Sequence, residues 1–376
     1  MKFKVSSSKI SEQLQNVSKV IAPKNALAIL DDVLFSLEGN ELSLIASDGE
    51  TTIRTAIEVE DVQGNGSVAF GAKIMLDTLK GFTAEVPLVF DIDESNFSLR
   101  MTSPNGEYSA VGVSGDNYPK IALDADADSH SFSIQASLLV EAINKTAFAA
   151  GNDELRPVMN GIFFDLNAEH VVMVATDAHR LVRYTNNTLH VEQPISFILP
   201  KKPANLIKGI FGKEDPEVTI FFGSKNARFA FNNTVIVCRQ VEGRYPNYNA
   251  VIPQNNTNTI TVDRETILAA CRRVAIYANN GSMLIRLALK ENQITISSQD
   301  IDFSTAAEET IPCSYNGPEM AIGFKAPFLI QLIDAIPSEE VILRLADPAR
   351  AGLILPVEQE ADTELLMLIM PMLLND

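Results

Sequence analysis

The residues best suited to chemistry are an aspartate and a histidine in the segment ATDAHRLVRY, at positions 175–184. Asp177 and His179, joined by a serine or a metal ion, could form a general-base site whose activity would follow the pKa of an imidazole. The chain contains no GxSxG, HExxH or glycine-rich phosphate loop. We therefore expect no catalytic residue and assign His179 to a binding surface or to structure, with an enzyme kept as the alternative.

The cysteines do not suggest a redox or metal centre. Cys238, Cys271 and Cys313 are odd in number and widely spaced, and no CxxC or Cys/His cluster is present. We expect no disulfide framework, no metal and no cofactor, and a reducing cytoplasm as the compartment. The opening MKFKVSSSKI lacks a signal-peptide core, and no run of about 18 apolar residues occurs, so neither secretion nor a membrane span is expected.

Length and composition indicate a folded protein of several domains. The chain has 376 residues, of which 46% are hydrophobic and 21% charged, which excludes a largely disordered chain. Its net charge of −18 argues against a surface that is basic all over, as in proteins that coat DNA. A basic stripe on an acidic body remains compatible with that average.

One local pattern occurs three times. MKFKVSSSKI (1–10), HSFSIQASLL (130–139) and NTITVDRETI (258–267) each alternate two apolar residues and then begin a helical pattern. A hairpin and a second helical segment follow in each case. The register is constant, with steps of 129 and 123 residues, through three sets of landmarks: Leu37, Leu166 and Leu289; Asp48, Asp177 and Asp300; Lys73, Lys202 and Lys325.

We therefore predict three copies of one unit, with domains at 1–128, 129–255 and 256–376. The acidic and polar stretch LDADADSH (123–130) is typical of a linker. Short alternating strands, broken by Gly, Asn and Pro, favour antiparallel hairpins. The expected fold class is α+β, with two helices packed on antiparallel sheet in each copy.

The bases are concentrated in the six expected helical segments. The segments are taken as residues 8–24, 72–81, 136–150, 200–213, 264–278 and 324–335. They carry 14 bases and 5 acids, a net charge of +9, and the rest of the chain has a net charge of −27. Lysines that merely solvate helix faces are one explanation. The repeat, however, places equivalent helices on one side of each unit, and such a basic face suits a phosphate backbone without reading sequence.

Four motifs accompany the repeat: ATDAHRLVRY (175–184), VEGRYPNYNAVIP (241–253), a shorter echo VSGDNYPKI (113–121) and the C-terminal LMLIMPMLL (366–374). TDxHRL, RYPxY and a terminal MPM in this order, after an opening MKF, closely resemble the bacterial DNA polymerase III beta subunit family, the beta sliding clamps. The resemblance runs the length of the chain. It implies the DNA clamp fold, in which three clamp domains per chain form a head-to-tail dimer ring of six domains.

The resemblance also implies a function in which no bond is made or broken. Such a ring encircles duplex DNA, slides because its phosphate contacts are not sequence-specific, and acts as a processivity factor that tethers the polymerase. The implied partners are double-stranded DNA, the replicative polymerase alpha subunit, an ATP-dependent clamp loader, other proteins with clamp-binding motifs and a second copy of the chain. The implied location is the cytoplasm, in association with the nucleoid.

Partner peptides of the family bind in a hydrophobic groove between the second and third domains. Carried over by motif, the groove here comprises Met159, Thr176, Ala178, His179, Arg180, Leu181, Pro246, Val251, Leu368, Met370, Pro371 and Met372. Methionines and leucines make an adaptable apolar slot, although ordinary core packing is the alternative for them. His179 and Arg180 can hydrogen-bond a peptide at the rim, and Arg180 can equally be a structural ion-pair partner of Asp177.

The chain departs from the family pattern near the groove. Ala178 stands where glycine is common, which restricts the local backbone. Leu373 replaces the arginine of a terminal Met-Pro-Met-Arg-Leu, and residues 375–376 extend the chain. One charge is therefore lost at the mouth of the groove.

The DNA contacts and the ring interface are implied less directly. Alignment with the family gives Lys24, Arg156, Lys201 and Lys202 as DNA contacts, and Lys80 is added on charge grounds. Ring closure would place an edge near Tyr108 of the first domain against Ile276 and Tyr277 of the third.

A scaffold that binds peptides but never DNA is the second alternative. The acidic average favours it, whereas the positive charge of the helices opposes it. Salt separates the two readings, because DNA binding weakens steeply as salt rises and apolar peptide binding does not.

Overall fold

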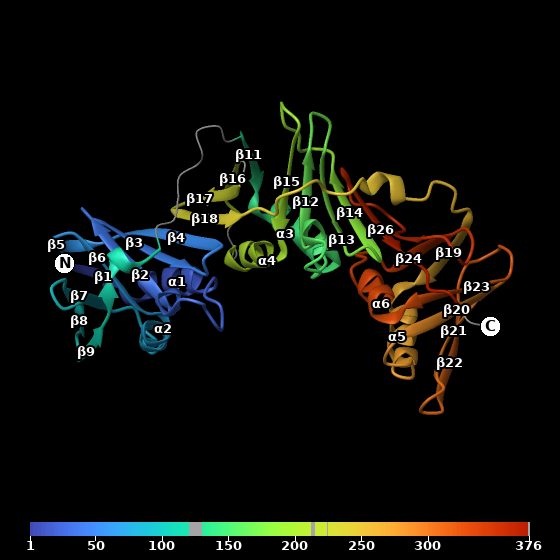
Figure 1. The fold of residues 1–376 in the computed structure, drawn as a ribbon, viewed down its shortest axis with the longest axis horizontal. Coiled ribbons are helices and arrows are strands. Elements are labelled where there is room, and N and C mark those ends of the chain that lie inside the picture. The colour runs from blue at the N-terminus through green and yellow to red at the C-terminus, as the bar shows by residue number, and fades with distance from the viewer. Residues whose placement is uncertain (120–129, 212–214, 224, 375–376) are drawn as a thin grey trace. The chain divides into compact units, whose positions relative to one another are not determined.

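The computed structural model describes residues 1–119, 130–211, 215–223 and 225–374 (Figure 1). The chain divides into two compact units, one of Met1–Val140 with Lys202–Gln240 and one of Glu141–Lys201 with Val241–Asp376. Each unit therefore contains part of the central repeat. The seam that we expect at residue 128 lies outside the described residues, and the boundaries at 128 and 255 stay predictions.

Two helices per repeat occur among the described residues, as the pattern predicts. They are α1 (Ser7–Ser18), α2 (Ala72–Lys80), α3 (Ala136–Thr146), α4 (Lys201–Ile210), α5 (Arg264–Ala275) and α6 (Ala326–Asp334). Their buried faces follow the expected spacing, as Ile10, Leu14 and Val17 of α1 show.

Several helices are shorter than the sequence suggested. α1 ends at Ser18, not near residue 24, because the chain then tightens: the N–H groups of Val20 and Ile21 donate to carbonyls three residues earlier, and Pro23 disfavours helical backbone at residue 22. Lys19 and Lys325 are capping residues outside α1 and α6, and Lys213 lies outside the described residues. The helices as observed carry ten bases and five acids, so their net charge is +5 and not the expected +9.

The first unit contains two sheets. The five-stranded sheet has the order β5 (Glu60–Gln63), β1 (Lys2–Ser6), β7 (Pro87–Asp93), β8 (Ser98–Ser103) and β9 (Gly106–Val111). The nine-stranded sheet has the order β10 (Val113–Ser114), β6 (Gly66–Gly71), β2 (Asp32–Glu38), β3 (Glu41–Ser47), β4 (Thr51–Glu58), β18 (Thr234–Arg239), β17 (Asn226–Phe231), β16 (Glu217–Phe222) and β11 (His130–Gln135).

The second unit also contains two sheets. The eight-stranded sheet has the order β15 (Ile195–Pro200), β12 (Gly161–Leu166), β13 (Val171–Thr176), β14 (Arg180–Asn186), β26 (Thr363–Ile369), β25 (Gly352–Pro356), β24 (Glu340–Leu345) and β19 (Asn258–Asp263). The four-stranded sheet has the order β22 (Thr305–Pro312), β21 (Gln293–Asp300), β20 (Leu284–Lys290) and β23 (Met320–Lys325).

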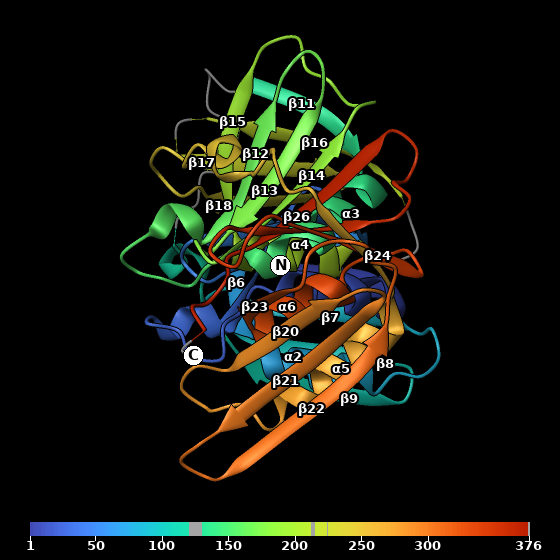
Figure 2. The same cartoon turned by 90° about the vertical axis from the view of Figure 1, so that its right-hand side faces the viewer.

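Pairing between repeats makes the long sheets. β4 of the first repeat pairs with β18 of the second, and β14 of the second pairs with β26 of the third, all antiparallel. The α+β class and the antiparallel hairpins that the sequence predicts are therefore confirmed. Within the second unit, α5 and α6 pack side by side, and the four-stranded sheet covers α5 (Figures 1 and 2).

The three repeats share the same hairpin chemistry. Leu37, Leu166 and Leu289 are each at most 2% exposed, and each lies at the turn end of its first strand. The three landmark aspartates close the next turn alike. Asp48 Oδ1 accepts from the N–H groups of Glu50 and Thr51, and Asp177 and Asp300 accept likewise from the residues two and three positions later. The register of the leucines and aspartates is thus a structural repeat. The three lysines differ, because Lys73 and Lys202 are the second residues of α2 and α4, whereas Lys325 precedes α6.

Candidate functional site

The turn between β13 and β14 is the part of the ATDAHRLVRY segment that could contact a partner. Asp177 Oδ1 accepts from the backbone N–H groups of His179 and Arg180, at 3.0 Å each. Thr176 Oγ1 donates to the Arg180 carbonyl at 2.6 Å and accepts from the Ala178 N–H at 3.1 Å. These bonds fix the turn and leave the side chains of Ala178 and His179 exposed.

Ala178 adopts a backbone conformation that favours glycine. Its φ is 73°, in the left-handed region, where a Cβ costs about 1–2 kcal/mol. The departure from glycine noted in the sequence therefore falls at the one position of this turn with a positive φ among the described residues. The hydrogen bonds of Asp177 and Thr176 hold the turn in spite of that strain.

Arg180 is buried, at 6% exposure, and serves the structure of the turn. Its Nε donates to Asp177 Oδ2 at 3.1 Å and its Nη2 to the Phe148 carbonyl at 2.7 Å, while its Nη1 donates to the side chain of Gln331. Burial lowers the pKa of Arg180, and the charge of Asp177 opposes that shift. Of the two roles expected for Arg180, the geometry favours the ion pair with Asp177 over a hydrogen bond to a partner at the rim.

Helix α6 contributes residues that the sequence analysis missed. Phe328 lies beneath the turn: its ring centroid is 4.6 Å from Arg180 Cζ and 6.0 Å from the His179 ring. Lys325 Nζ lies 5.0 Å from the same centroid. The repeat register pointed to Lys325 as an equivalent of Lys202, but no local pattern indicated that α6 meets the turn.

The C-terminal tail, residues 370–374, is held by two backbone hydrogen bonds. The Met370 N–H donates to the His179 carbonyl and the Met372 N–H to the Gly323 carbonyl, at 2.8 Å each. A Cβ at Gly323 would lie 2.8 Å from side-chain atoms of Leu284 and Leu374 and 3.0 Å from the Met372 carbonyl oxygen. The tail can cross β23 this closely because residue 323 is glycine.

The segment 241–252 packs on the eight-stranded sheet, against the apolar cluster that contains Leu181 and Leu368. Tyr245 and Tyr248 are buried, with the Tyr245 ring stacked on Phe163 at 4.5 Å and the Tyr248 hydroxyl donating to Asp165 Oδ2 at 2.8 Å. Burial raises the pKa of both phenols, so both remain neutral donors. These anchors leave Pro246 exposed between them.

The predicted groove residues form a buried floor and an exposed edge. Leu181 and Leu368 pair across β14 and β26 and belong to one apolar cluster with Tyr245 and Tyr248. Val251 is 54% exposed and Met370 41% exposed. Thr176 is buried in the turn, whereas three further members are half-buried, namely Met159, Pro371 and Met372. Core packing thus accounts for Leu181 and Leu368, and the exposed apolar members need another explanation.

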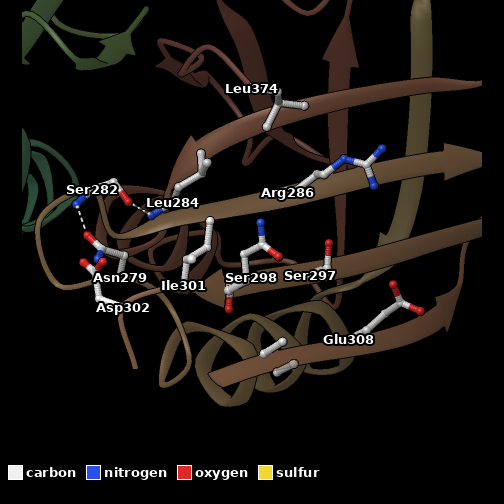
Figure 3. A pocket seen from close by; sticks show the side chains of 13 residues that line it. Asn279, Ser282, Leu284, Arg286, Ser297, Ser298, Ile301, Asp302, Glu308 and Leu374 are labelled. Atoms are coloured by element: carbon white, nitrogen blue, oxygen red, sulfur yellow. Dashed lines mark hydrogen bonds between the residues drawn. The ribbon is translucent and has the colours of Figure 1, made fainter. Parts of the chain in front are cut away.

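A hollow lies on the four-stranded sheet, on the face that carries Arg286 (Figure 3). Arg286, Ser297 and Glu308 face one another there across β20, β21 and β22, and Leu374 of the tail is among the lining residues. The sequence analysis did not predict this hollow.

The five predicted DNA contacts differ in how far their charges are already paired. Lys24 and Lys80 are exposed and have no ion pair in the described part of the chain, with Lys24 in a loop after α1 and Lys80 at the end of α2. Arg156 Nε lies 2.8 Å from Asp153 Oδ2. Lys201 Nζ donates to the Ala150 carbonyl at 3.1 Å, and Lys202 bonds Asp48.

The electrostatics of Lys201 and Lys202 reflect these partners. Burial, followed by the charge of Arg180, lowers the pKa of Lys201. Partial burial alone would raise the pKa of Asp48, but the hydrogen bond from Lys202 and the N–H of Thr51 lower it overall. Of the five predicted contacts, Lys24 and Lys80 are therefore the most available to a phosphate.

The residues predicted for ring closure are exposed at free sheet edges or next to them. β9 is an edge strand, and Tyr108 on it is 41% exposed. β22 is the edge of the four-stranded sheet, and α5, which packs on that sheet, is followed by Ile276 and Tyr277, 78% and 44% exposed. Exposed apolar side chains beside unpaired strand edges are typical of surfaces that another chain covers.

Nothing in the described residues favours catalysis. The Oδ1 and Oδ2 atoms of Asp177 are engaged by the turn and by Arg180, so they do not orient His179 as a base. Burial raises the pKa of the Cys238 and Cys271 thiols to about 12, which keeps both protonated near neutral pH. No group of three or more potential metal ligands is found among these residues, and no described helix is long and apolar enough to span a membrane.

Three α+β repeats, each with two helices, whose sheets pair from one repeat to the next, are the architecture of the clamp class of binding proteins. Three sequence-family models of the DNA polymerase III beta subunit match the three repeats: the N-terminal domain matches residues 1–122, the central domain 133–247 and the C-terminal domain 249–373. The chain belongs to the DNA polymerase III beta subunit family. It is accordingly a non-catalytic processivity factor of DNA polymerase, as the sequence analysis predicted.

Known beta sliding clamps are similar to this chain over nearly its full length. The beta sliding clamp of Haemophilus influenzae is 27% identical over 375 residues, 99% of this chain and 100% of the relative. That of Pseudomonas aeruginosa is 26% identical and covers 97% of each chain. The crystal structure of the DNA polymerase III subunit beta from P. aeruginosa superposes with a TM-score of 0.93 at 26% identity and full coverage of both chains. Another structure of that protein, bound to griselimycin, has a TM-score of 0.91 at 25% identity, again with full coverage of both chains.

Proposed function

We propose that two copies of this chain close head to tail into a ring around duplex DNA, and that the ring holds the replicative polymerase alpha subunit through an apolar peptide groove. The observation that carries the proposal is the exposure of apolar side chains above a buried floor. Val251, Met370 and Pro246 are exposed, and each is within two residues of a member of the buried apolar cluster that contains Leu181 and Leu368, both at most 3% exposed. A rim of methionine and proline over an aliphatic floor accepts short apolar peptides of varied shape.

The proposed groove uses the residues that the sequence analysis predicted, but Arg180 supports its wall and does not contact the peptide. His179 and Met370 are joined through their backbones, so the turn and the tail form one wall. Arg180 holds that wall from beneath and does not read the peptide. Other proteins that carry a clamp-binding motif would compete for the same groove.

The DNA contacts are assigned to Lys24, Lys80, Arg156, Lys201 and Lys202. Lys24 and Lys80 would contribute most of these five, because among the described residues they have no ion pair that must be exchanged for a phosphate. Contacts to phosphate alone favour no position on the duplex, which permits sliding.

Ring closure would join the edge strand β9 of one copy to the edge strand β22 of the other. Tyr108 lies on the first edge, and Ile276 and Tyr277 lie beside the second. Replacement of Ile276 by arginine should therefore convert a particle of twice 41.0 kDa into one of 41.0 kDa in mass photometry. An unchanged mass would exclude Ile276 from the interface.

An ATP-dependent loader would open and close such a ring, and the cytoplasm, at the nucleoid, is the compartment that fits. The chain offers no glycine-rich phosphate loop, so the nucleotide would be bound by the loader. Tethering then keeps the polymerase at high effective concentration beside the primer end.

The division between DNA binding and peptide binding can be tested directly. Duplex DNA binding is measured by fluorescence anisotropy over a range of salt for the parent and for Lys24→Gln, Lys80→Gln and Lys201→Gln/Lys202→Gln. Each lost phosphate contact should reduce the slope of log affinity against log salt by about 1. Lys290→Gln is the matched control, because Lys290 is 62% exposed, stands at the end of a strand and belongs to no helix.

The same variants are then tested with a fluorescent apolar hexapeptide that ends in Leu-Phe. Peptide affinity should be unchanged by the lysine substitutions and reduced by Val251→Asp, which places a charge on the exposed apolar edge. Equal losses of DNA and peptide binding would contradict separate surfaces. Peptide binding without any salt-dependent DNA binding would favour a scaffold that never binds DNA.

A further inference from the structure

The ring of Phe328 is surrounded by basic side chains. Arg180 Cζ lies 4.6 Å from its centroid, Lys325 Nζ lies 5.0 Å from it, and the imidazole of His179 stacks on it at 6.0 Å with 26° between the planes. An aromatic face attracts cations, so Phe328 holds these groups at one place at modest electrostatic cost. The three come from different elements: the β13–β14 turn, the start of β14 and the residue before α6.

The positive charge at this place is not neutralised by the protein. Asp177 is paired with Arg180, whereas Lys325 has no carboxylate within ion-pair distance in the described part of the chain. Lys201 adds a further charge, since it interacts electrostatically with both Arg180 and Asp177. Three cations, those of Arg180, Lys201 and Lys325, thus gather near one carboxylate, that of Asp177, although the chain as a whole has a net charge of −18.

Helix stability does not explain Lys325. It occupies the N-cap of α6, where the helix dipole is positive and a cation is unfavourable, and the first turn of α6 contains no acidic residue. The stem of Lys325 is half-buried, and its ammonium group is aligned over Phe328 beside the exposed His179. Its placement therefore suits an external anion better than an internal partner.

The cluster adjoins the proposed groove. The carbonyl of His179 accepts from the Met370 N–H, and Met370 is one of the exposed apolar groove residues. The carbonyl of Gly323, two residues before Lys325, accepts from the Met372 N–H of the same tail. A peptide that contacts Met370 therefore has Lys325 and His179 at its side.

We propose that Lys325 and His179 form an anion-reading subsite at the rim of the groove, which accepts the carboxylate of an aspartate or glutamate in a partner peptide. This inference rests on the proposed function of the groove. The ammonium group supplies the charge and the imidazole N–H a directed hydrogen bond, while Phe328 fixes both orientations. Lys325 and His179 are thus specificity-determining residues: they select acidic peptides, and the apolar floor supplies the affinity.

The test uses paired synthetic peptides and the full-length protein. Four pairs of acetylated, amidated hexapeptides end in Leu-Phe and differ within a pair only by glutamate or glutamine at one of the four preceding positions. In at least one pair, the glutamate peptide should bind the parent about two- to fivefold more tightly at low salt, and the preference should shrink as salt rises. Lys325→Gln should abolish that preference and leave the affinity for the glutamine peptide unchanged.

Two variants separate charge from structure. Lys325→Arg keeps the cation and the stacking on Phe328, so it should keep the preference for glutamate. Lys290→Gln removes an exposed lysine elsewhere in the same unit and should also keep it. A parent without any glutamate preference, or a preference that survives Lys325→Gln, would overturn the proposal.

Other outcomes are distinguishable from that failure. Binding of the glutamine peptides without a glutamate preference would refute the subsite and leave the groove intact, whereas no binding of any peptide would refute the groove itself. A Lys325→Gln variant that loses duplex DNA affinity and keeps its peptide preference would assign Lys325 to phosphate binding, which also overturns the proposal.

Discussion

The guanidinium of Arg180 lies over the ring of Phe328, with 4.6 Å between Cζ and the ring centroid. This contact joins the turn that begins β14 to the first turn of α6, two elements that are about 150 residues apart in the sequence. Both Asp177 and the Phe148 carbonyl bind the same guanidinium from other sides. The wall of the proposed groove therefore depends on one buried cation.

Replacement of Arg180 by alanine should be strongly destabilising, because it leaves Asp177 Oδ2 and the Phe148 carbonyl without the buried guanidinium that now donates to both. We expect a loss of about 3–5 kcal/mol in the free energy of unfolding, measured by urea denaturation. Arg156→Ala removes an exposed ion pair of the same i, i+3 spacing and should cost far less, because solvent screens an exposed pair. Similar losses for the two variants would show that Arg180 does not organise the turn.

Ala178→Gly should stabilise the protein. The φ of 73° at Ala178 disfavours any side chain, and glycine relieves that strain at some cost in the entropy of the unfolded chain. We expect a net gain of about 0.5–1 kcal/mol and a rise in Tm by scanning calorimetry. Ala178→Val, which adds a branch at the strained position, should lower Tm; a fall in Tm for the glycine variant would contradict the strain.

Gly323→Ala should weaken peptide binding through the C-terminal tail. A Cβ there would lie 2.8 Å from Leu374 Cδ2 and 3.0 Å from the Met372 carbonyl, so the tail must move away from β23. We expect lower affinity for the apolar hexapeptide, by anisotropy, with an unchanged particle mass. Gly209→Ala is the matched control, since a Cβ at that helical glycine meets no atom within 4 Å.

The pair formed by Asp48 and Lys202 should make stability depend on pH. The pKa of Asp48 is lowered in the folded protein, so its contribution is present above the unfolded value near 3.9 and disappears as the pH falls through the folded value. Asp48→Asn should therefore unfold at lower urea than the parent near pH 7, with the difference narrowing below about pH 4.

Lys202→Gln provides the check on this pair. If Asp48→Asn is destabilising because it removes the pair with Lys202, the double variant should lose less free energy of unfolding than the two single variants lose in sum. A double-mutant cycle measures this coupling. Fully additive losses would show that the two side chains act independently.

The threefold repeat was the most predictable feature, because each copy shows the same apolar and polar pattern at a constant spacing along the chain. Leu37, Leu166 and Leu289 are buried at equivalent strand ends, and the three landmark aspartates make the same turn. Helix ends were less predictable: α1 stops at Ser18, six residues before the expected end, where the chain tightens into turns ahead of Pro23.

The candidate site could be predicted only in part. The turn, the tyrosine segment and the tail carry local motifs, so the sequence indicated His179, Pro246 and Met370. The contacts of Arg180 with Gln331 and Phe328 arise from the packing of α6 against a distant turn, which no local pattern encodes. Pairing between repeats, such as β14 with β26, is likewise a long-range property.

The most direct test of the central claim is negative-stain electron microscopy of the purified protein at micromolar concentration, together with its mass by mass photometry. The account predicts closed rings with six lobes and a central hole, at twice the chain mass of 41.0 kDa. Compact particles without a hole, at the mass of a single chain, would contradict it.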